Sequence, residues 1–237
     1  MSTTIKKCTW IEEGYGYDAS GLGIIFNKIA RGAGRRVFAR IAGSGARLYV
    51  FTRGKDLAQT ATVTDSVTWT NPTYDRDWDD ATQAYVSLAA NTARTTLRTY
   101  DIGAVKNVLL HLRYQSDASY VYIYLAVSSD GATWTDVYSG FSTTAVSLFF
   151  KVTARYFRVD GANQTTSAYK LYVNSFEIFD TANYDQMVES AGHPVELEVS
   201  PADQKVTVWH DCPNLCDWQI YTVRCARLAS LSMLEVA

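Results

Sequence analysis

The residues best suited to bind a metal or to form disulfides lie near the two ends of the sequence. Cys8 stands near the start, and His210, Cys212, Cys216 and Cys225 form the pattern His-x-Cys-x3-Cys-x8-Cys near the end. Thiolate and imidazole groups can hold zinc in a tetrahedral site, although this spacing differs from that of the usual zinc knuckle. Three alternatives follow: disulfides, one of them joining Cys8 to the C-terminal part, free buried thiols, or a zinc site.

Residues that could act in hydrolysis do not form a known catalytic pattern. The sequence contains neither Gly-x-Ser-x-Gly nor His-Glu-x-x-His, and its glycine clusters lack the Lys-Ser/Thr pair of a phosphate-binding loop. Glu196 and Glu198 share one face of a predicted strand, but they alternate with aliphatic residues, which places that face in solvent. We therefore interpret the chain as non-enzymatic.

The composition favours strands as the elements that position these residues. Apolar residues make up 47% of the chain, charged residues 19% and aromatic residues 13%. Many aromatic residues with few charges suit a pleated, half-buried surface. No stretch approaches the roughly 20 apolar residues that span a bilayer, and the first residues lack the apolar run of a secretion signal. We expect an all-β protein without a membrane span or a standard export signal.

The clearest strand covers residues 119–127, where aliphatic and tyrosine residues alternate. Alternation places Val121, Ile123, Leu125 and Val127 on one face and Tyr120, Tyr122 and Tyr124 on the other. The aliphatic face is predicted to be core. The tyrosine face could stack on sugars, contact another subunit or lie under a second packed layer.

Further strands are predicted along the middle and end of the chain, and only residues 185–190 look briefly helical. The predicted strands are 105–115, 145–152, 154–160, 168–179, 195–199, 205–209 and 218–223.

Five motifs follow one another through the middle of the chain. They are Asp77-Trp-Asp-Asp-Ala-Thr82, Asp101-Ile-Gly103, Ser128-Ser-Asp-Gly-Ala-Thr-Trp-Thr135, Ala154-Arg-Tyr-Phe-Arg-Val159 and Asn174-Ser-Phe-Glu-Ile-Phe179. In type and order they resemble the discoidin family, also called the coagulation-factor C-type domain, and the related family 32 carbohydrate-binding modules. The resemblance covers residues 66–180. It implies an antiparallel β-sandwich, the galactose-binding-like jelly roll.

This resemblance divides the chain into three parts. We expect an N-terminal β-hairpin region at 1–62, the discoidin-like jelly roll at 63–182, and a C-terminal β extension at 183–237. No linker rich in proline, glycine or serine separates them, so we expect them to pack together.

The resemblance also implies a structural calcium ion. The residues that match the family's ligands are Asp77, Thr82 and Glu177. Calcium takes six to eight oxygen ligands, which a turn rich in Asp and Thr can supply in part. The usual glycine of this turn is missing here. The alternatives are a calcium site and a plain hydrogen-bonded turn.

Family members bind ligands through variable loops at one end of the sandwich. The aromatic and polar loop residues selected as ligand-binding candidates are Tyr74, Trp78, Tyr138, Phe141 and Asn163. The alternative is that they are ordinary rim or inter-subunit residues.

Charge is uneven, because residues 21–55 contain eight Lys and Arg residues and no acid, whereas the whole chain has a net charge of −2. Such a stretch can bind nucleic acid or an anionic glycan, can dock on the acidic part of a neighbouring copy, or can be a solvated hairpin face.

Two functions fit these features. The main interpretation is a structural or adhesion component of a virus particle, tail or similar extracellular surface assembly, whose partners are copies of itself, other assembly proteins and cell-surface glycans. The alternative is a stand-alone glycan-binding module. Nucleic acid is not an expected partner.

Overall fold

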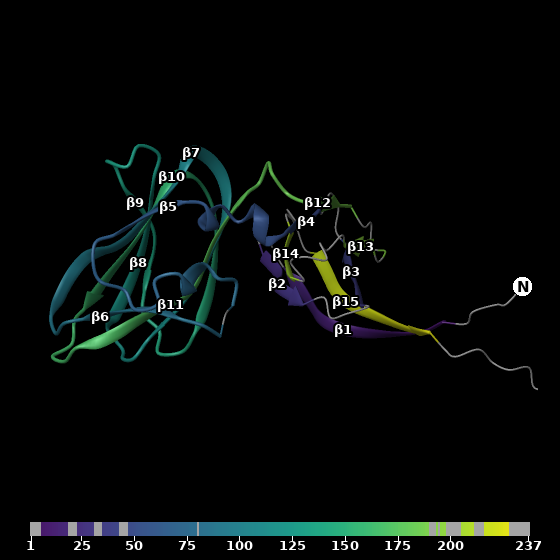
Figure 1. Ribbon diagram of the computed structural model, residues 1–237, viewed down its shortest axis with the longest axis horizontal. Coiled ribbons are helices and arrows are strands. Elements are labelled where there is room, and N and C mark those ends of the chain that lie inside the picture. Colours follow the sequence, from purple (N-terminus) through teal and green to yellow (C-terminus); the bar gives the residue numbers. More distant parts are fainter. Residues whose placement is uncertain are drawn as a thin grey trace, which may run out of the picture. The chain divides into compact units, whose positions relative to one another are not determined.

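The computed structural model describes the backbone of residues 6–18, 23–30, 35–42, 47–79, 81–189, 193, 195–197, 205–210 and 216–227. Side chains are described for residues 38–42, 47–79, 81–187, 189, 193, 195–197 and 208. The chain forms two compact units. The jelly-roll unit is Arg53–Tyr184, and the terminal unit combines Met1–Thr52 with Asp185–Ala237. Strands are the main element of both units, and the helical segments are short (Figure 1), which confirms the all-β prediction.

The terminal unit contains eight strands among its described residues. They are β1 (Lys6–Asp18), β2 (Gly23–Ala30), β3 (Arg35–Ala42), β4 (Leu48–Phe51), β12 (Gln186–Val188), β13 (Val195–Leu197), β14 (Lys205–His210) and β15 (Cys216–Arg227). They form two four-stranded sheets, in the orders β1-β15-β3-β13 and β12-β4-β14-β2. Both sheets therefore combine strands from the beginning and the end of the sequence.

The briefly helical character predicted for residues 185–190 is wrong. Gln186, Met187 and Val188 pair with Val50, Tyr49 and Leu48 of β4 as a short antiparallel strand. A periodic pattern over so few residues is weak, and pairing with a neighbouring strand decides the structure instead.

The jelly-roll unit contains seven strands and three short 3₁₀ turns. They are η1 (Arg53–Lys55), η2 (Leu57–Gln59), β5 (Thr62–Asp65), η3 (Tyr74–Arg76), β6 (Ala84–Leu88), β7 (Thr92–Ser116), β8 (Val121–Ser128), β9 (Thr135–Gly140), β10 (Val146–Asn163) and β11 (Tyr169–Asp180). All the pairings are antiparallel, in the order β6-β11-β7-β10-β8-β9, and β5 pairs with β7.

Two long strands, β7 and β10, take part in both layers of the sandwich. The first part of β7, up to Asp101, pairs with β5 and with the end of β10. Its second part pairs with β11 and with the start of β10. Figure 1 shows β7 curving between these two parts. The strands predicted separately at 145–152 and 154–160 are thus one strand, in which the register shifts between Ala154 and Tyr156.

The curve in β7 lies at the motif Asp101-Ile-Gly103. Gly103 has a φ of 84°, a conformation that costs glycine little because it has no Cβ atom. The Asp101 carboxylate accepts a hydrogen bond from the Gly103 amide at 2.7 Å and two from the Arg155 guanidinium at 2.8 Å each. The hydrogen bonds from Arg155 lower the pKa of Asp101. Two of the sequence motifs therefore meet here and stabilise the change of direction.

The core of the jelly-roll unit lies between its two layers. It includes the aliphatic residues Val121, Ile123 and Leu125 of β8, as the alternation predicts, together with Phe157 of β10 and Phe176 of β11. The side chains of Tyr122 and Tyr124 are on the other face of β8 and remain partly exposed.

The motif beginning at Ser128 forms the turn between β8 and β9. The Asp130 carboxylate accepts hydrogen bonds from the amides of Thr133 and Ala132 and from the Ser128 hydroxyl, and these lower its pKa to about 2. Gly131 adopts a φ of 77°. The residues of this motif stabilise the turn and thereby the fold.

Among the residues that the structure describes, no helix is long and apolar enough to cross a membrane.

Candidate functional site

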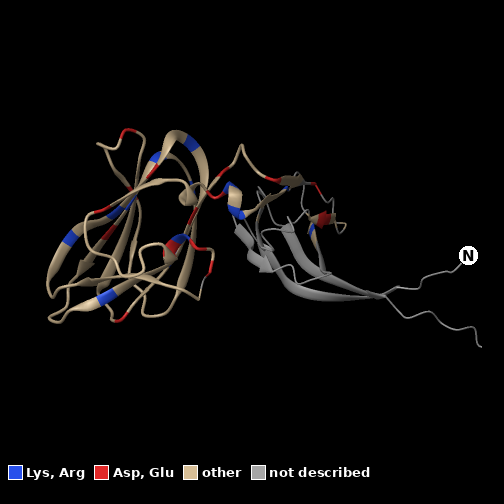
Figure 2. Ribbon diagram, viewed as in Figure 1, with Lys and Arg blue, Asp and Glu red and all other residues tan. Residues whose placement is uncertain are grey.

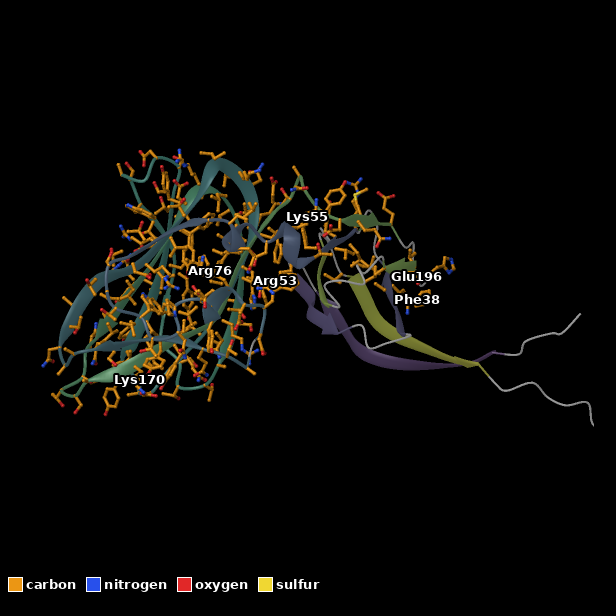
Figure 3. All side chains as sticks on the ribbon, in the orientation of Figure 1. Phe38, Arg53, Lys55, Arg76, Lys170 and Glu196 are labelled. Atoms are coloured by element: carbon orange, nitrogen blue, oxygen red, sulfur yellow. The ribbon has the colours of Figure 1, made fainter. Side chains whose placement is uncertain are left out.

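Four loops meet at the end of the jelly-roll unit that lies away from its two chain ends. They are 89–91, 117–120, 141–145 and 164–168, which connect β6 to β7, β7 to β8, β9 to β10 and β10 to β11. We refer to them as the loop end. In Figure 3, Lys170 at the start of β11 marks this end, and Arg53 marks the opposite one.

Backbone hydrogen bonds hold these loops to one another and to the strands. The Asn91 amide donates to the Thr165 carbonyl at 2.9 Å, and the Gln164 amide donates to the Tyr120 carbonyl at 3.0 Å. The Ser116 amide at the end of β7 donates to the Ser142 carbonyl at 2.8 Å. Loops tied in this way present their side chains with little conformational freedom.

Asn163 strengthens the same junction from inside. It is fully buried, and its amide nitrogen lies 3.1, 3.0 and 2.8 Å from the carbonyl oxygens of Leu88, Ala89 and Ser167. Its side-chain oxygen accepts hydrogen bonds from the Thr165 amide and hydroxyl. The side-chain nitrogen and oxygen of Asn163 thus make hydrogen bonds within the loop end. Asn163 has a structural role there and is not a ligand-contacting residue of the aromatic surface.

Four aromatic rings form a continuous group on this end, which we call the aromatic surface. Its members are Tyr120, Phe141, Tyr122 and Tyr124. The Phe141 ring is central, with centroid distances of 5.3 Å to Tyr120 and 5.1 Å to Tyr122. Tyr120 is 56% exposed and Phe141 is 40% exposed. A group of exposed aromatic rings is a common feature of binding surfaces.

Tyr120 has an unusual backbone conformation, with a φ of 65°. A bulky residue rarely adopts positive φ, because its Cβ atom crowds the backbone, and the strain costs on the order of 1–3 kcal/mol. The hydrogen bond from Gln164 to the Tyr120 carbonyl fixes this turn. Tyr120, the most exposed large hydrophobic side chain among those that the structure describes, is thus held in a strained position, which is typical of functional sites.

Charged groups at the edge of the aromatic surface are paired with each other. The Arg94 guanidinium lies 4.4 Å from the centre of the Tyr124 ring. It donates two hydrogen bonds to Asp136, at 2.7 and 2.5 Å, and one to Asp160 at 2.8 Å. The hydrogen bonds from Arg94 lower the pKa of Asp136. The result is an aromatic surface bordered by balanced charge.

The other ligand-binding candidates lie in different places. Trp78 is 3% exposed and donates to Asp56 at 2.8 Å. Tyr138 is partly buried against the core, and its hydroxyl lies 2.7 Å from that of Tyr114. Tyr74 is 39% exposed in η3, outside the four loops. Of the five candidates, only Phe141 belongs to the aromatic surface.

Of the three calcium candidates, Asp77 and Thr82 are in contact with each other, whereas the contact observed for Glu177 is with His111. The Thr82 hydroxyl donates a hydrogen bond to one oxygen of the Asp77 carboxylate at 2.7 Å. The other carboxylate oxygen of Asp77 accepts a hydrogen bond from the Asp79 amide at 2.8 Å. The Glu177 carboxylate is buried, 3.3 Å from Nδ1 of His111. Among the described residues, no group of three or more His, Cys, Asp or Glu side chains is placed to hold a metal ion. Calcium binding stays a prediction.

For the cysteines, the structure gives backbone positions only. Cys8 in β1 lies directly opposite Cys225 in β15, and Cys216 lies opposite Asp18. His210 ends β14, and Cys212 falls outside the described residues, as do the side chains of all five candidates. The three alternatives for these residues remain open.

No known family model and no curated protein matches the sequence. Several solved structures resemble the fold. One is the CBM32-1 module of a family 31 glycoside hydrolase from Clostridium perfringens, with 16% identity, a TM-score of 0.39 and coverage of 52% of this chain and 96% of that one. Another is chitosan-binding module 1 from a chitosanase/glucanase of Paenibacillus sp. IK-5, with 23% identity, a TM-score of 0.38 and coverage of 52% and 98%.

These similar structures are carbohydrate-binding modules. A further one is the CBM32 of AlyQ in complex with 4,5-unsaturated mannuronic acid, with 23% identity, a TM-score of 0.33 and coverage of 50% of this chain and 93% of that one. They include members of the family 32 modules that the sequence motifs indicated.

Proposed function

We propose that the jelly-roll unit is a non-catalytic module that binds glycans at its loop end. The observation that carries this proposal is the aromatic surface, in which Tyr120, held at positive φ, and Phe141 expose their rings side by side on four interlinked loops.

The chemistry of the aromatic surface suits a sugar. One face of many pyranose rings presents C–H groups that pack against an aromatic ring, and the sugar hydroxyls need nearby polar groups. Here Tyr120 and Tyr122 carry hydroxyls of their own, and two exposed polar residues lie next to Tyr120: Ser119 precedes it in the chain, and the Gln164 amide donates a hydrogen bond to its carbonyl. Because Arg94 is neutralised by Asp136 and Asp160, this surface is better matched to neutral sugar units.

The carboxylates around the loop end are not arranged for acid–base catalysis. Asp136 and Asp160 are held by Arg94, and Asp117 accepts from the Tyr172 hydroxyl at 2.8 Å. A glycosidase needs two carboxylates that face each other across the scissile bond, one of them protonated. These contacts favour binding over hydrolysis. The role in a virus particle or similar assembly stays a prediction.

A glycan array tests this proposal. The full chain is compared with Tyr120→Ala on an array that includes chitooligosaccharides and uronic-acid oligosaccharides, the kinds of sugar present in two structures of similar fold. We expect a defined set of glycans to bind the wild-type chain and to lose most of its signal with Tyr120→Ala. Absence of binding, or equal binding by the folded variant, would contradict the proposal.

A further inference from the structure

A small cavity lies at the other end of the jelly-roll unit, among its three 3₁₀ turns. Its lining residues are Arg53, Gln59, Thr73, Arg76 and Asp77, and its volume is about 250 Å³. We call it the two-arginine pocket. In Figure 3, Arg53 and Arg76 lie next to each other and far from Lys170, which marks the loop end. The pocket is therefore separate from the aromatic surface.

Gln59 gives the pocket a fixed internal arrangement. Its side-chain nitrogen donates to the carbonyl oxygen of Arg76 and, at 3.2 Å, to the carboxylate of Asp56, which is itself 2% exposed. Its side-chain oxygen then faces Arg53, whose Nε and Nη2 atoms are both 3.4 Å away. A buried carboxylate thus anchors the amide that holds one of the two guanidinium groups.

The two guanidinium groups are incompletely neutralised. Arg53 makes no ion pair with any residue that the structure describes, and its contacts with Gln59 are long. Arg76 lies 3.4 Å from Asp75, but Asp75 also pairs with Arg98 at 2.7 Å. Figure 2 shows the positive charge of the turn that holds Arg53, which also contains Lys55. The Lys55 ammonium donates a hydrogen bond to Asn183 at 2.7 Å and is not among the lining residues.

Among the residues that the structure describes, Asp77 is the one carboxylate that lines the pocket, and its oxygens already accept hydrogen bonds. One accepts from the Asp79 amide and the other from the Thr82 hydroxyl, both within its own turn. The described lining residues therefore carry two guanidinium charges against one carboxylate. An incoming anion would meet donors from Arg53 and Arg76, with the Thr73 hydroxyl beside them.

We propose that the two-arginine pocket is a second binding site, which takes one carboxylate or sulfate group of an acidic saccharide. Guanidinium groups bind planar or tetrahedral oxyanions through paired, charge-assisted hydrogen bonds. Sites for whole drug-sized ligands usually exceed about 300 Å³, so this pocket suits a single anionic group with part of a sugar ring. The choice of a saccharide rests on the proposed glycan-binding function, whereas the preference for an oxyanion does not.

NMR titration of the ¹⁵N-labelled full chain tests this site. The probes are sodium glucuronate, sodium sulfate and neutral glucose, at constant ionic strength. We expect saturable shifts of the Arg53 and Arg76 Nε–H signals with glucuronate or sulfate and none with glucose. Arg53→Gln, which changes an exposed side chain, should weaken binding about tenfold or more, because one charge-assisted contact contributes that much.

Two variants make the result specific. Arg47→Gln removes the same charge from an exposed arginine paired with Glu189 and should leave binding unchanged. Phe141→Ala should also bind the anion normally, so that failure of this site and failure of the aromatic surface are distinguishable. Equal shifts with glucose, non-saturating shifts, or unchanged affinity in Arg53→Gln would overturn the proposal. Saturable binding of sulfate without binding of glucuronate would support a site for oxyanions but contradict the proposal that its ligand is a uronic acid.

Discussion

Arg98 and Asp75 form an ion pair inside the jelly-roll unit, with 2.7 Å between Nη1 and Oδ2 and with both side chains 1% exposed. The Arg98 guanidinium also bonds to Asp65 at 2.5 and 3.0 Å and lies 4.4 Å from the centre of the Trp69 ring. Asp75 accepts a further hydrogen bond from the Tyr100 hydroxyl. This network connects η3, and with it one wall of the two-arginine pocket, to β5 and β7.

We expect Asp75→Ala to lower the free energy of unfolding by about 3–5 kcal/mol, because it leaves a buried guanidinium without one of its partners. Urea denaturation of both proteins measures the difference. Glu189→Ala is the matched control, since it breaks the exposed pair with Arg47 and should cost no more than about 1 kcal/mol. A cost of less than 1 kcal/mol for Asp75→Ala would mean that the pair does not stabilise the fold.

Asn163→Asp should destabilise the loop end. The substitution places a carboxylate oxygen where an amide nitrogen now faces three carbonyl oxygens. We expect a loss of about 2–4 kcal/mol, from the lost hydrogen bonds and the buried charge. Thermal unfolding monitored by circular dichroism measures it, with the exposed Gln164→Glu as a control of equal charge change. An unchanged melting temperature would argue against the structural role of Asn163.

The stability of the jelly-roll unit should depend on the ionisation of Asp56. Burial, together with the nearby charge of Glu177, raises the pKa of Asp56 from its ordinary 3.8 to about 7. The folded state therefore binds this proton more tightly than the unfolded state. The stabilisation is complete below pH 4 and is lost as the pH rises to 7, by up to about 4 kcal/mol at roughly 1.4 kcal/mol per pKa unit.

Asp56→Asn removes this ionisation. The difference in unfolding free energy between the wild type and Asp56→Asn should fall between pH 4 and pH 7 and stay constant above that range. Denaturant titrations at several pH values give this difference. Parallel profiles for the two proteins would show that Asp56 does not titrate in this window.

The register of β1 and β15 favours one pairing of the cysteines. Residues directly opposite in antiparallel strands have Cα atoms about 4.5–5.5 Å apart, which lies within the range for a disulfide. Because Cys8 is opposite Cys225, we expect mild oxidation to link these two residues. Peptide mapping without reduction identifies the linked peptides, with Cys8→Ser as the control. A link from Cys225 to Cys212 or Cys216 would contradict this expectation.

The sequence predicted core strands such as β8 and β11, but not β5, β6, β9 or the first part of β7. The sandwich followed from the family resemblance of the five motifs. Alternation in residues 119–127 separates the core side chains from Tyr122 and Tyr124. The motifs at Asp101 and Ser128 contain glycines that adopt positive φ, the first at the curve within β7 and the second in the turn between β8 and β9. These features depend on residues that are close together in the sequence, so the sequence pattern is enough to predict them.

The grouping of the aromatic surface could not be derived from the sequence. Tyr120 and Phe141 belong to different loops and meet only because β8 and β9 pair in a particular register. Tyr120 was visible as part of the tyrosine face, but its positive φ depends on the contact with Gln164. Trp78 and Asn163, by contrast, have residue types typical of ligand contacts, and tertiary hydrogen bonds bury them.

The most direct test of glycan binding at the loop end is isothermal titration calorimetry with the glycan that gives the strongest array signal. The wild type is compared with Phe141→Ala and with Tyr74→Ala, which removes an aromatic ring of similar exposure outside the four loops. We expect Phe141→Ala to weaken binding at least about tenfold, as for a central aromatic contact, and Tyr74→Ala to bind within about twofold of the wild type. Unchanged affinity in a folded Phe141→Ala variant, or loss of binding in Tyr74→Ala, would contradict a glycan site on the aromatic surface.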